Sequence, residues 1–190
     1  MKLKMLVAAL LVAGSSIASA QSSMTLGYAV QDDVSPAVQK HVNSVKVQTR
    51  LFGNVDGDIG ISATTADVAN TISNRYEGGL TYSHDLTSWA SGSVRGAYGV
   101  KQSSGKPEFS YYSVEPAVTV KTPIEGLSAK VGYRMRDAVN SDAVAADRNN
   151  TVRYQVAYAL TKQDKVAVGY DIQRGDGANK TIALNYTRGF

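Results

Sequence analysis

Apolar and polar residues alternate along most of this chain with a period of two. The pattern is clearest in the last ten residues, TIALNYTRGF, where Ile182, Leu184, Tyr186 and Phe190 share one parity. Small or polar residues, such as Asn185, share the other parity. Successive side chains of a strand point to opposite faces, so this spacing predicts a strand with one apolar face and one polar face.

The same alternation recurs along the chain, interrupted by segments rich in residues that favour turns. We expect ten strands, at about 22–31, 43–52, 58–65, 71–83, 88–101, 108–121, 127–137, 150–161, 165–173 and 181–190. Short connections are expected near residues 54, 85, 124 and 163. Mostly longer, polar connections are expected at 32–42, 66–70, 102–107 and 138–149. The pattern therefore predicts hairpins that are short on one side of the sheet and longer on the other.

After residue 20, no apolar run approaches the roughly 20 residues that a membrane-spanning helix needs. Strands can cross a membrane only as a closed barrel, because lipid leaves no backbone polar group a partner. Even strand counts are the rule in bacterial single-chain barrels. We therefore predict an all-β fold, a closed antiparallel up-and-down transmembrane β-barrel of ten strands, with eight or twelve as alternatives. Strand 181–190 must then pair with strand 22–31.

The C-terminal strand also carries a resemblance to a known class of proteins. A terminal Phe190, with alternating apolar residues before it and Tyr186 four positions upstream, resembles the C-terminal signature of Gram-negative outer-membrane β-barrels. The resemblance implies that Tyr186 and Phe190 are the assembly signal read by the barrel-assembly machinery. It also implies location in the cell outer membrane, with outer-membrane lipid around the barrel.

The start of the chain has the features of a secretory signal peptide. Lys2 and Lys4 precede a short apolar run at 5–13, and Ala18 and Ala20 supply a small-residue cleavage site. We expect residues 1–20 to be removed, which leaves residues 21–190 as the barrel.

Composition narrows the classes of function. The chain has 20 Lys and Arg against 16 Asp and Glu, with no basic run carrying interleaved aromatics, which argues against a nucleic-acid partner. It has no Cys, hence no disulfide framework or thiol chemistry. We expect no cofactor and no metal: Asp56 and Asp58 lie close together, but no EF-hand spacing is present. Eleven Tyr fit interfacial girdles, although Tyr is also a good strand former.

If the apolar parity faces lipid, the polar parity faces the lumen, because Arg or Lys against lipid at mid-depth costs roughly 2–4 kcal/mol. The expected pore-lining residues are Lys46, Arg50, Arg75, Glu77, Arg95, Glu115, Lys130, Arg134, Arg136, Arg153 and Asp171. Basic groups dominate this set, which favours anions. We therefore expect a porin for passive diffusion of small, preferably anionic solutes. The alternative is a non-transporting structural or adhesive barrel whose Arg and Glu side chains plug a narrow lumen.

A small barrel lined by arginines is similar to the oligogalacturonate-specific porin family. That resemblance implies twelve strands and passage of acidic oligosaccharides. The segment QSSMTLGYAVQDD also resembles the opening strand of general porins. No substrate-binding residue can be carried over from either family.

Two kinds of residue remain to be placed. His41 is expected in the first long connection and His84 in a short turn, and no spacing around them matches a nucleophile–base motif, so we expect no enzyme. Pro116 lies inside predicted strand 108–121, where a closed barrel has no edge to hide a missing donor. We expect a bulge there, or a shorter strand.

Overall fold

The computed structural model describes residues 21–34, 38–66, 72–139 and 148–190. The strands are β1 (Ser22–Asp33), β2 (Gln39–Phe52), β3 (Val55–Ala66), β4 (Ile72–Asp85), β5 (Ala90–Ser103), β6 (Lys106–Lys121), β7 (Leu127–Ala138), β8 (Asn149–Ala159), β9 (Asp164–Gly175) and β10 (Asn179–Gly189). The expected signal peptide at 1–20 lies outside the described residues. Across the described ranges, no helix is long and apolar enough to cross a membrane.

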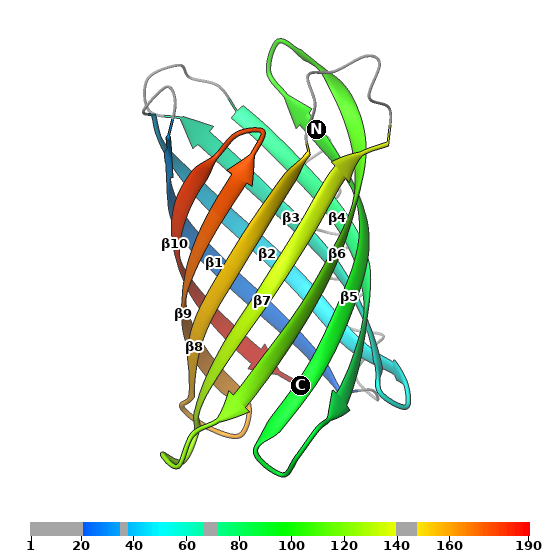
Figure 1. The fold of residues 1–190 in the computed structure, drawn as a ribbon, viewed down its shortest axis with the longest axis vertical. Helices are drawn as coiled ribbons and strands as arrows, with labels where there is room; N and C mark the ends of the chain where they lie inside the picture. Colours follow the sequence, from blue (N-terminus) through cyan, green and yellow to red (C-terminus); the bar gives the residue numbers. More distant parts are fainter. Residues whose placement is uncertain (1–20, 35–37, 67–71, 140–147) are drawn as a thin grey trace.

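Each strand pairs antiparallel with its neighbours in the chain, and β1 pairs with β10 to close the barrel. The strands slant across the barrel wall, as Figure 1 shows. The predicted ten-strand, closed, up-and-down architecture is confirmed, and the eight- and twelve-strand alternatives are wrong.

The closing seam joins the two ends of the barrel sequence in continuous register. Leu26 lies opposite Tyr186, and the pairing runs without a shift from Ser23 to Asp33 on β1. The amide of Phe190 donates to the carbonyl of Ser22 at 2.9 Å. Closure therefore gives both potential edge strands a partner and removes the exposed edges of an open sheet.

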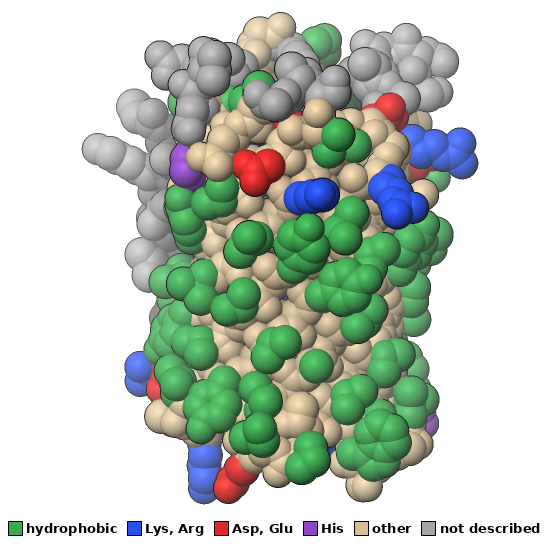
Figure 2. Space-filling model, turned by 60° about the vertical axis from the view of Figure 1, so that its left-hand side comes forward, with side chains coloured by type: hydrophobic (Ala, Val, Ile, Leu, Met, Phe, Trp, Pro, Cys, Tyr) green, Lys and Arg blue, Asp and Glu red, His purple; other side chains and the backbone are tan. Residues whose placement is uncertain are grey.

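The apolar parity forms the outer surface. Large hydrophobic side chains such as Leu80, Val168 and Ile182 are more than half exposed there. On the face that Figure 2 shows, hydrophobic side chains cover the middle of the barrel and charged side chains lie near its two ends. We call the end where β2, β4, β6 and β8 finish the turn end, and the opposite one the loop end. An outward apolar band of this kind is the surface that a transmembrane barrel presents to lipid.

The connections differ from the sequence prediction at the loop end. The expected connection at 32–42 is wrong, because β1 runs to Asp33, β2 starts at Gln39, and Val30 pairs with His41. The link between β5 and β6 is as tight as the one between β2 and β3. Polar side chains continue a strand readily where water can solvate them, so composition placed the strand ends too early.

Both histidines consequently lie in strands and not in connections. His41 belongs to β2, where its Nδ1 lies 2.7 Å from the hydroxyl of Tyr28 and the two rings stack. His84 belongs to β4 and shares the outward parity of Tyr82.

The prediction of a bulge or a shorter strand at Pro116 is also wrong. Val94 pairs with Pro116, the ladder to β5 keeps one register from Ala90 to Lys101, and β6 extends from Lys106 to Lys121. On the β7 side the bridges skip Glu115 and Pro116 and then resume at Ala117 in the same register. The missing proline donor is thus accommodated by a local gap in one ladder, without inserting a residue.

Candidate functional site

The polar parity of the strands faces the interior of the barrel. The predicted pore-lining side chains come from seven strands: Lys46 and Arg50 from β2, Arg75 and Glu77 from β4, Arg95 from β5, Glu115 from β6, Lys130, Arg134 and Arg136 from β7, Arg153 from β8, and Asp171 from β9. Each has the parity opposite to the exposed apolar residues of its strand, apart from Phe52, which follows a register shift in β2. Burial agrees with this placement, since Glu115 is 7% exposed and Arg136 is 4% exposed.

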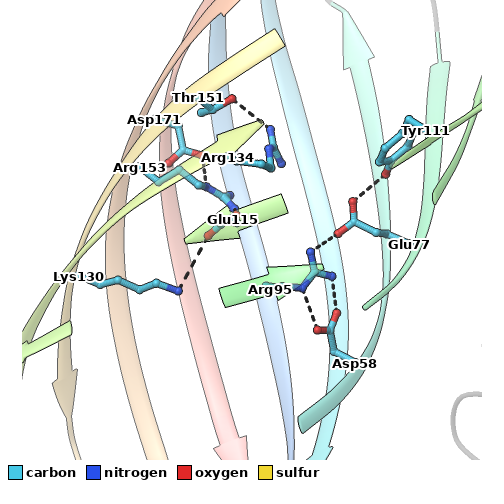
Figure 3. A network of polar contacts seen from close by, with 10 residues as sticks. All are labelled: Asp58, Glu77, Arg95, Tyr111, Glu115, Lys130, Arg134, Thr151, Arg153 and Asp171. Atoms are coloured by element: carbon cyan, nitrogen blue, oxygen red, sulfur yellow. Dashed lines mark hydrogen bonds and ion pairs between the residues drawn. The ribbon is translucent and has the colours of Figure 1, made fainter. Parts of the chain in front are cut away.

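One group of interior side chains centres on Arg95. Its guanidinium donates to both carboxylate oxygens of Asp58, through Nε at 2.9 Å and Nη2 at 2.6 Å. Its Nη1 donates to Glu77 at 2.6 Å, and the other oxygen of Glu77 accepts from the Tyr111 hydroxyl at 2.8 Å (Figure 3). These are charge-assisted bonds, and Arg95 is held between two carboxylates. We call Asp58, Glu77, Arg95 and Tyr111 the first ion-pair group.

Two glycines make room for this group. A Cβ at Gly79 would lie 2.7 Å from Nη2 of Arg95, so the guanidinium needs the bare backbone there. A Cβ at Gly99 would overlap the ring of Tyr111 and approach the Tyr76 carbonyl to 2.8 Å. The fully buried Tyr111 ring therefore packs over Gly99.

A second ion-pair group, formed by Glu115, Lys130, Arg153 and Asp171, lies on β6 to β9. Arg153 donates through Nε to Asp171 at 3.0 Å and through Nη1 to Glu115 at 2.8 Å. The Lys130 ammonium lies 4.0 Å from the other oxygen of Glu115. Arg153, like Arg95, has two carboxylate partners, and Figure 3 shows the two groups facing the same interior.

A third group, formed by Arg75, Arg134 and Arg136 nearer the loop end, differs from the first two in its balance of charge. We call it the arginine cluster. The guanidinium groups of Arg75 and Arg136 lie 5.7 and 5.1 Å from the centre of the Tyr111 ring, within cation–π range. Arg134 makes one long contact, from Nη2 to the Thr151 hydroxyl at 3.4 Å. Among the residues that the structure describes, no carboxylate forms an ion pair with Arg75 or Arg134.

The remaining two predicted residues lie apart from this arginine cluster. Arg50, towards the turn end, pairs with Asp56 and donates to the Gly53 carbonyl at 2.9 Å. Lys46 interacts electrostatically with Asp58 and with Lys130, and so lies between the two ion-pair groups.

The polar contacts run along the wall rather than across the lumen. Within the described part of the chain, the bonds from Asp58 to Arg95, Glu77 to Tyr111 and Glu115 to Arg153 each join strands two positions apart in the barrel order. The inward face of β1 and β10 carries mostly small, uncharged side chains, among them Ala29 and Ala183, with Gln31 and Asp33 at the loop end. The strands that carry the charged side chains thus lie across the barrel order from a wall of mostly small residues.

Sequence reasoning missed one member of the site, Asp58. It has the parity opposite to Ile59 and Ile61, so parity could have marked it as inward. Tyr111 has the inward parity too, opposite to Tyr112 and Val114, and the pattern predicts it, with Phe109, as an interaction patch or a lid over the lumen. Parity gives no hint of the partners of either residue.

The two residues of the expected assembly signal lie at the turn end. The hydroxyl of Tyr186 donates to Asp164 at 2.5 Å, and Arg188 lies 3.7 Å from the same carboxylate. Phe190 is 67% exposed beside the closing seam. Both aromatic side chains have the outward parity of β10.

Known structures share this architecture. The fold matches an outer-membrane channel of Pseudomonas putida F1 with a TM-score of 0.59 and 9% identity over 90% of this chain and 96% of that one. It matches the NanC porin with a TM-score of 0.59 and 9% identity over 87% and 98% of the two chains. It matches the KdgM porin in complex with disordered oligogalacturonate with a TM-score of 0.51 and 12% identity over 88% and 99%.

No protein-family model matches the sequence. No curated protein matches it either. The identities to the solved structures are low, so the likeness establishes the fold alone, a closed β-barrel of the kind found in these outer-membrane channels and porins.

Proposed function

We propose that the protein is an outer-membrane channel for the passive diffusion of small solutes, with a preference for anions. The observation that carries this proposal is the presence of interior arginines, Arg75 and Arg134, that have no ion-pair partner among the described residues. Fixed positive charge in a low-dielectric passage raises the local concentration of anions and lowers that of cations. The apolar outer belt and the fold shared with outer-membrane channels support the location.

Acidic oligosaccharides are a candidate class of anionic solute. The KdgM porin, whose structure is that of a complex with oligogalacturonate, has a similar barrel. A guanidinium fork binds a carboxylate through two parallel hydrogen bonds, which suits uronic acids as well as smaller carboxylates. Addition of oligogalacturonate to a conducting channel should therefore reduce the chloride current in a concentration-dependent manner.

The proposal is tested by the reversal potential of the purified barrel in planar bilayers under a KCl gradient. Wild-type protein should give an anion-selective potential. An Arg75→Gln, Arg134→Gln double variant should move that potential towards zero, because both substitutions remove interior positive charge. Arg188→Gln is the matched control, since Arg188 has the outward parity of β10 and pairs with Asp164. A cation-selective wild type, or a double variant with unchanged selectivity, contradicts the proposal.

The alternative function is a structural or adhesive barrel that does not transport. It is favoured by the neutralised groups around Arg95 and Arg153 and by the complete burial of Tyr111. A heat-modifiable gel shift reports whether the purified barrel is folded. A folded barrel that never conducts would support this alternative and exclude the channel.

A further inference from the structure

The arginine cluster near the loop end has the properties of a binding site. We infer that Arg134 and Arg75, the latter lying over the Tyr111 ring, form a saturable site for a compact oxyanion such as phosphate. The inference rests on the proposed function for placing this site on a conduction path, but binding can be measured without transport. It differs from a general anion preference because it requires directed hydrogen bonds from particular guanidinium groups.

The first support is the rigidity of the aromatic centre of the cluster. Tyr111 has no exposed surface, and its hydroxyl donates to Glu77, which is itself bonded to Arg95. The bare backbone of Gly99 leaves room for the ring. The cation–π contact with this fixed ring holds the Arg75 guanidinium before any ligand arrives. A pre-organised donor loses less entropy when it binds an anion.

The second support is a set of donors without acceptors. The Nε atoms of Arg75 and Arg134 are buried, and neither has a hydrogen-bond partner among the described residues. The contact of Arg134 with Thr151, at 3.4 Å, is too long to be a strong bond. A buried donor that lacks an acceptor is costly, so an incoming acceptor gains more than the ordinary net value of a hydrogen bond.

The third support is the balance of charge. Arg134 interacts electrostatically with three other arginines, Arg153, Arg136 and Arg75, and with two carboxylates, Glu115 and Glu77. Mutual repulsion among the arginines is relieved when an anion enters. Arg95 and Arg153 already have two carboxylates each and offer no such gain. Arg75 and Arg134 therefore leave an excess of positive charge in the loop half of the interior.

The geometry of these donors selects the chemical class of the ligand. A guanidinium presents its N–H groups as a planar fork that matches two oxygens of a phosphate or carboxylate. A halide is a single atom, so it cannot offer two separate acceptor oxygens to the two parallel N–H groups of the fork. A compact oxyanion can accept from more than one arginine at once, whereas chloride should pass with weak affinity.

The binding test uses inorganic phosphate and the folded, detergent-solubilised barrel in a chloride buffer of constant ionic strength. Titration calorimetry should show saturable phosphate binding to the wild type and to Arg188→Gln. Arg134→Lys keeps the charge but loses the fork, so its phosphate affinity should fall by about ten-fold or more. Thr151→Val, which removes the neighbouring hydroxyl and leaves both arginines, should still bind phosphate. A gel shift for each variant establishes that it has folded.

Outcomes for binding and for transport can be separated. Saturable phosphate binding that is lost in Arg134→Lys supports the site even if the barrel does not conduct, in which case the proposed channel function fails alone. An anion-selective channel with no saturable phosphate binding overturns the site and leaves the channel function standing. Phosphate binding of equal affinity in the wild type and Arg134→Lys also overturns the inference, because net charge alone would then explain it.

Discussion

Replacing Arg95 by methionine should destabilise the barrel by about 3–5 kcal/mol, the usual cost of removing one partner from a buried ion pair. Arg95 donates three bonds of 2.6 to 2.9 Å to Asp58 and Glu77. The side chain of Asp58 is 1% exposed and that of Glu77 is 17% exposed, so neither carboxylate can recover its hydration without rearrangement. The estimate therefore reflects two carboxylates left in a poorly solvated interior.

The free energy of unfolding can be followed by urea titration in lipid vesicles, using the fluorescence of Trp89, the one tryptophan of the chain. Arg50→Met is the matched control, because Arg50 is 41% exposed and its partner Asp56 also accepts from Gln48 at 3.1 Å. Its ion pair should contribute no more than about 1 kcal/mol.

A triple variant separates charge from packing. Arg95→Met combined with Asp58→Asn and Glu77→Gln removes the two carboxylate charges that Arg95→Met leaves without their guanidinium, and should recover most of the stability lost in Arg95→Met. If Arg95→Met is no more destabilising than the Arg50→Met control, the reasoning is refuted. Water in the lumen would then solvate both carboxylates, and the interior would be wetter than the short ion pairs indicate.

Three further outcomes are expected. Gly99→Ala should lower the free energy of unfolding by about 1–3 kcal/mol in the same urea titration, because the new Cβ overlaps Tyr111. Gly96→Ala is the control: its new Cβ would have nothing within 4 Å, so it should change the free energy of unfolding by less than about 0.5 kcal/mol. Equal urea midpoints for the two variants would contradict the packing of Tyr111 over Gly99. Deleting Phe190 removes only one backbone hydrogen bond, to Ser22, so the protein that does fold should conduct normally. The yield of assembled barrel in the membrane should fall, because the expected assembly signal is lost. A normal yield would contradict the assembly role of Phe190. The size of the single-channel current should differ between voltages of opposite sign, because the arginines without an ion-pair partner in the described chain lie towards the loop end. Currents of equal size at both signs of voltage would argue against that distribution of charge.

The strand count and the facing of the side chains were predictable because both depend on local chain geometry. Alternation in segments such as 181–190 assigns each residue to a face without knowledge of its neighbours. The same parity assigned Arg134 and Arg153 to the interior. Strand ends were less predictable, since polar residues near His41 continue the ladder where composition predicted a connection.

The effect of Pro116 could not be read from the sequence either. A missing donor can be accommodated by an inserted residue or by a gap in one ladder, and both leave the same local pattern. The structure has the gap, because β7 resumes the same register with β6 after the proline and the register of β5 does not change at it. Register is set by all the pairs of two neighbouring strands together.

The sequence by itself determined a closed barrel with an apolar outer face and a basic interior, because a period of two and the cost of charge in lipid suffice for both. Only the tertiary structure decided which of those charges neutralise each other. Asp58 and Arg95 are 37 residues apart, and Glu115 and Arg153 are 38 apart, on strands that are not neighbours. Closure of the barrel brings these pairs together, and it leaves Arg134 without a carboxylate of the described chain in ion-pair contact.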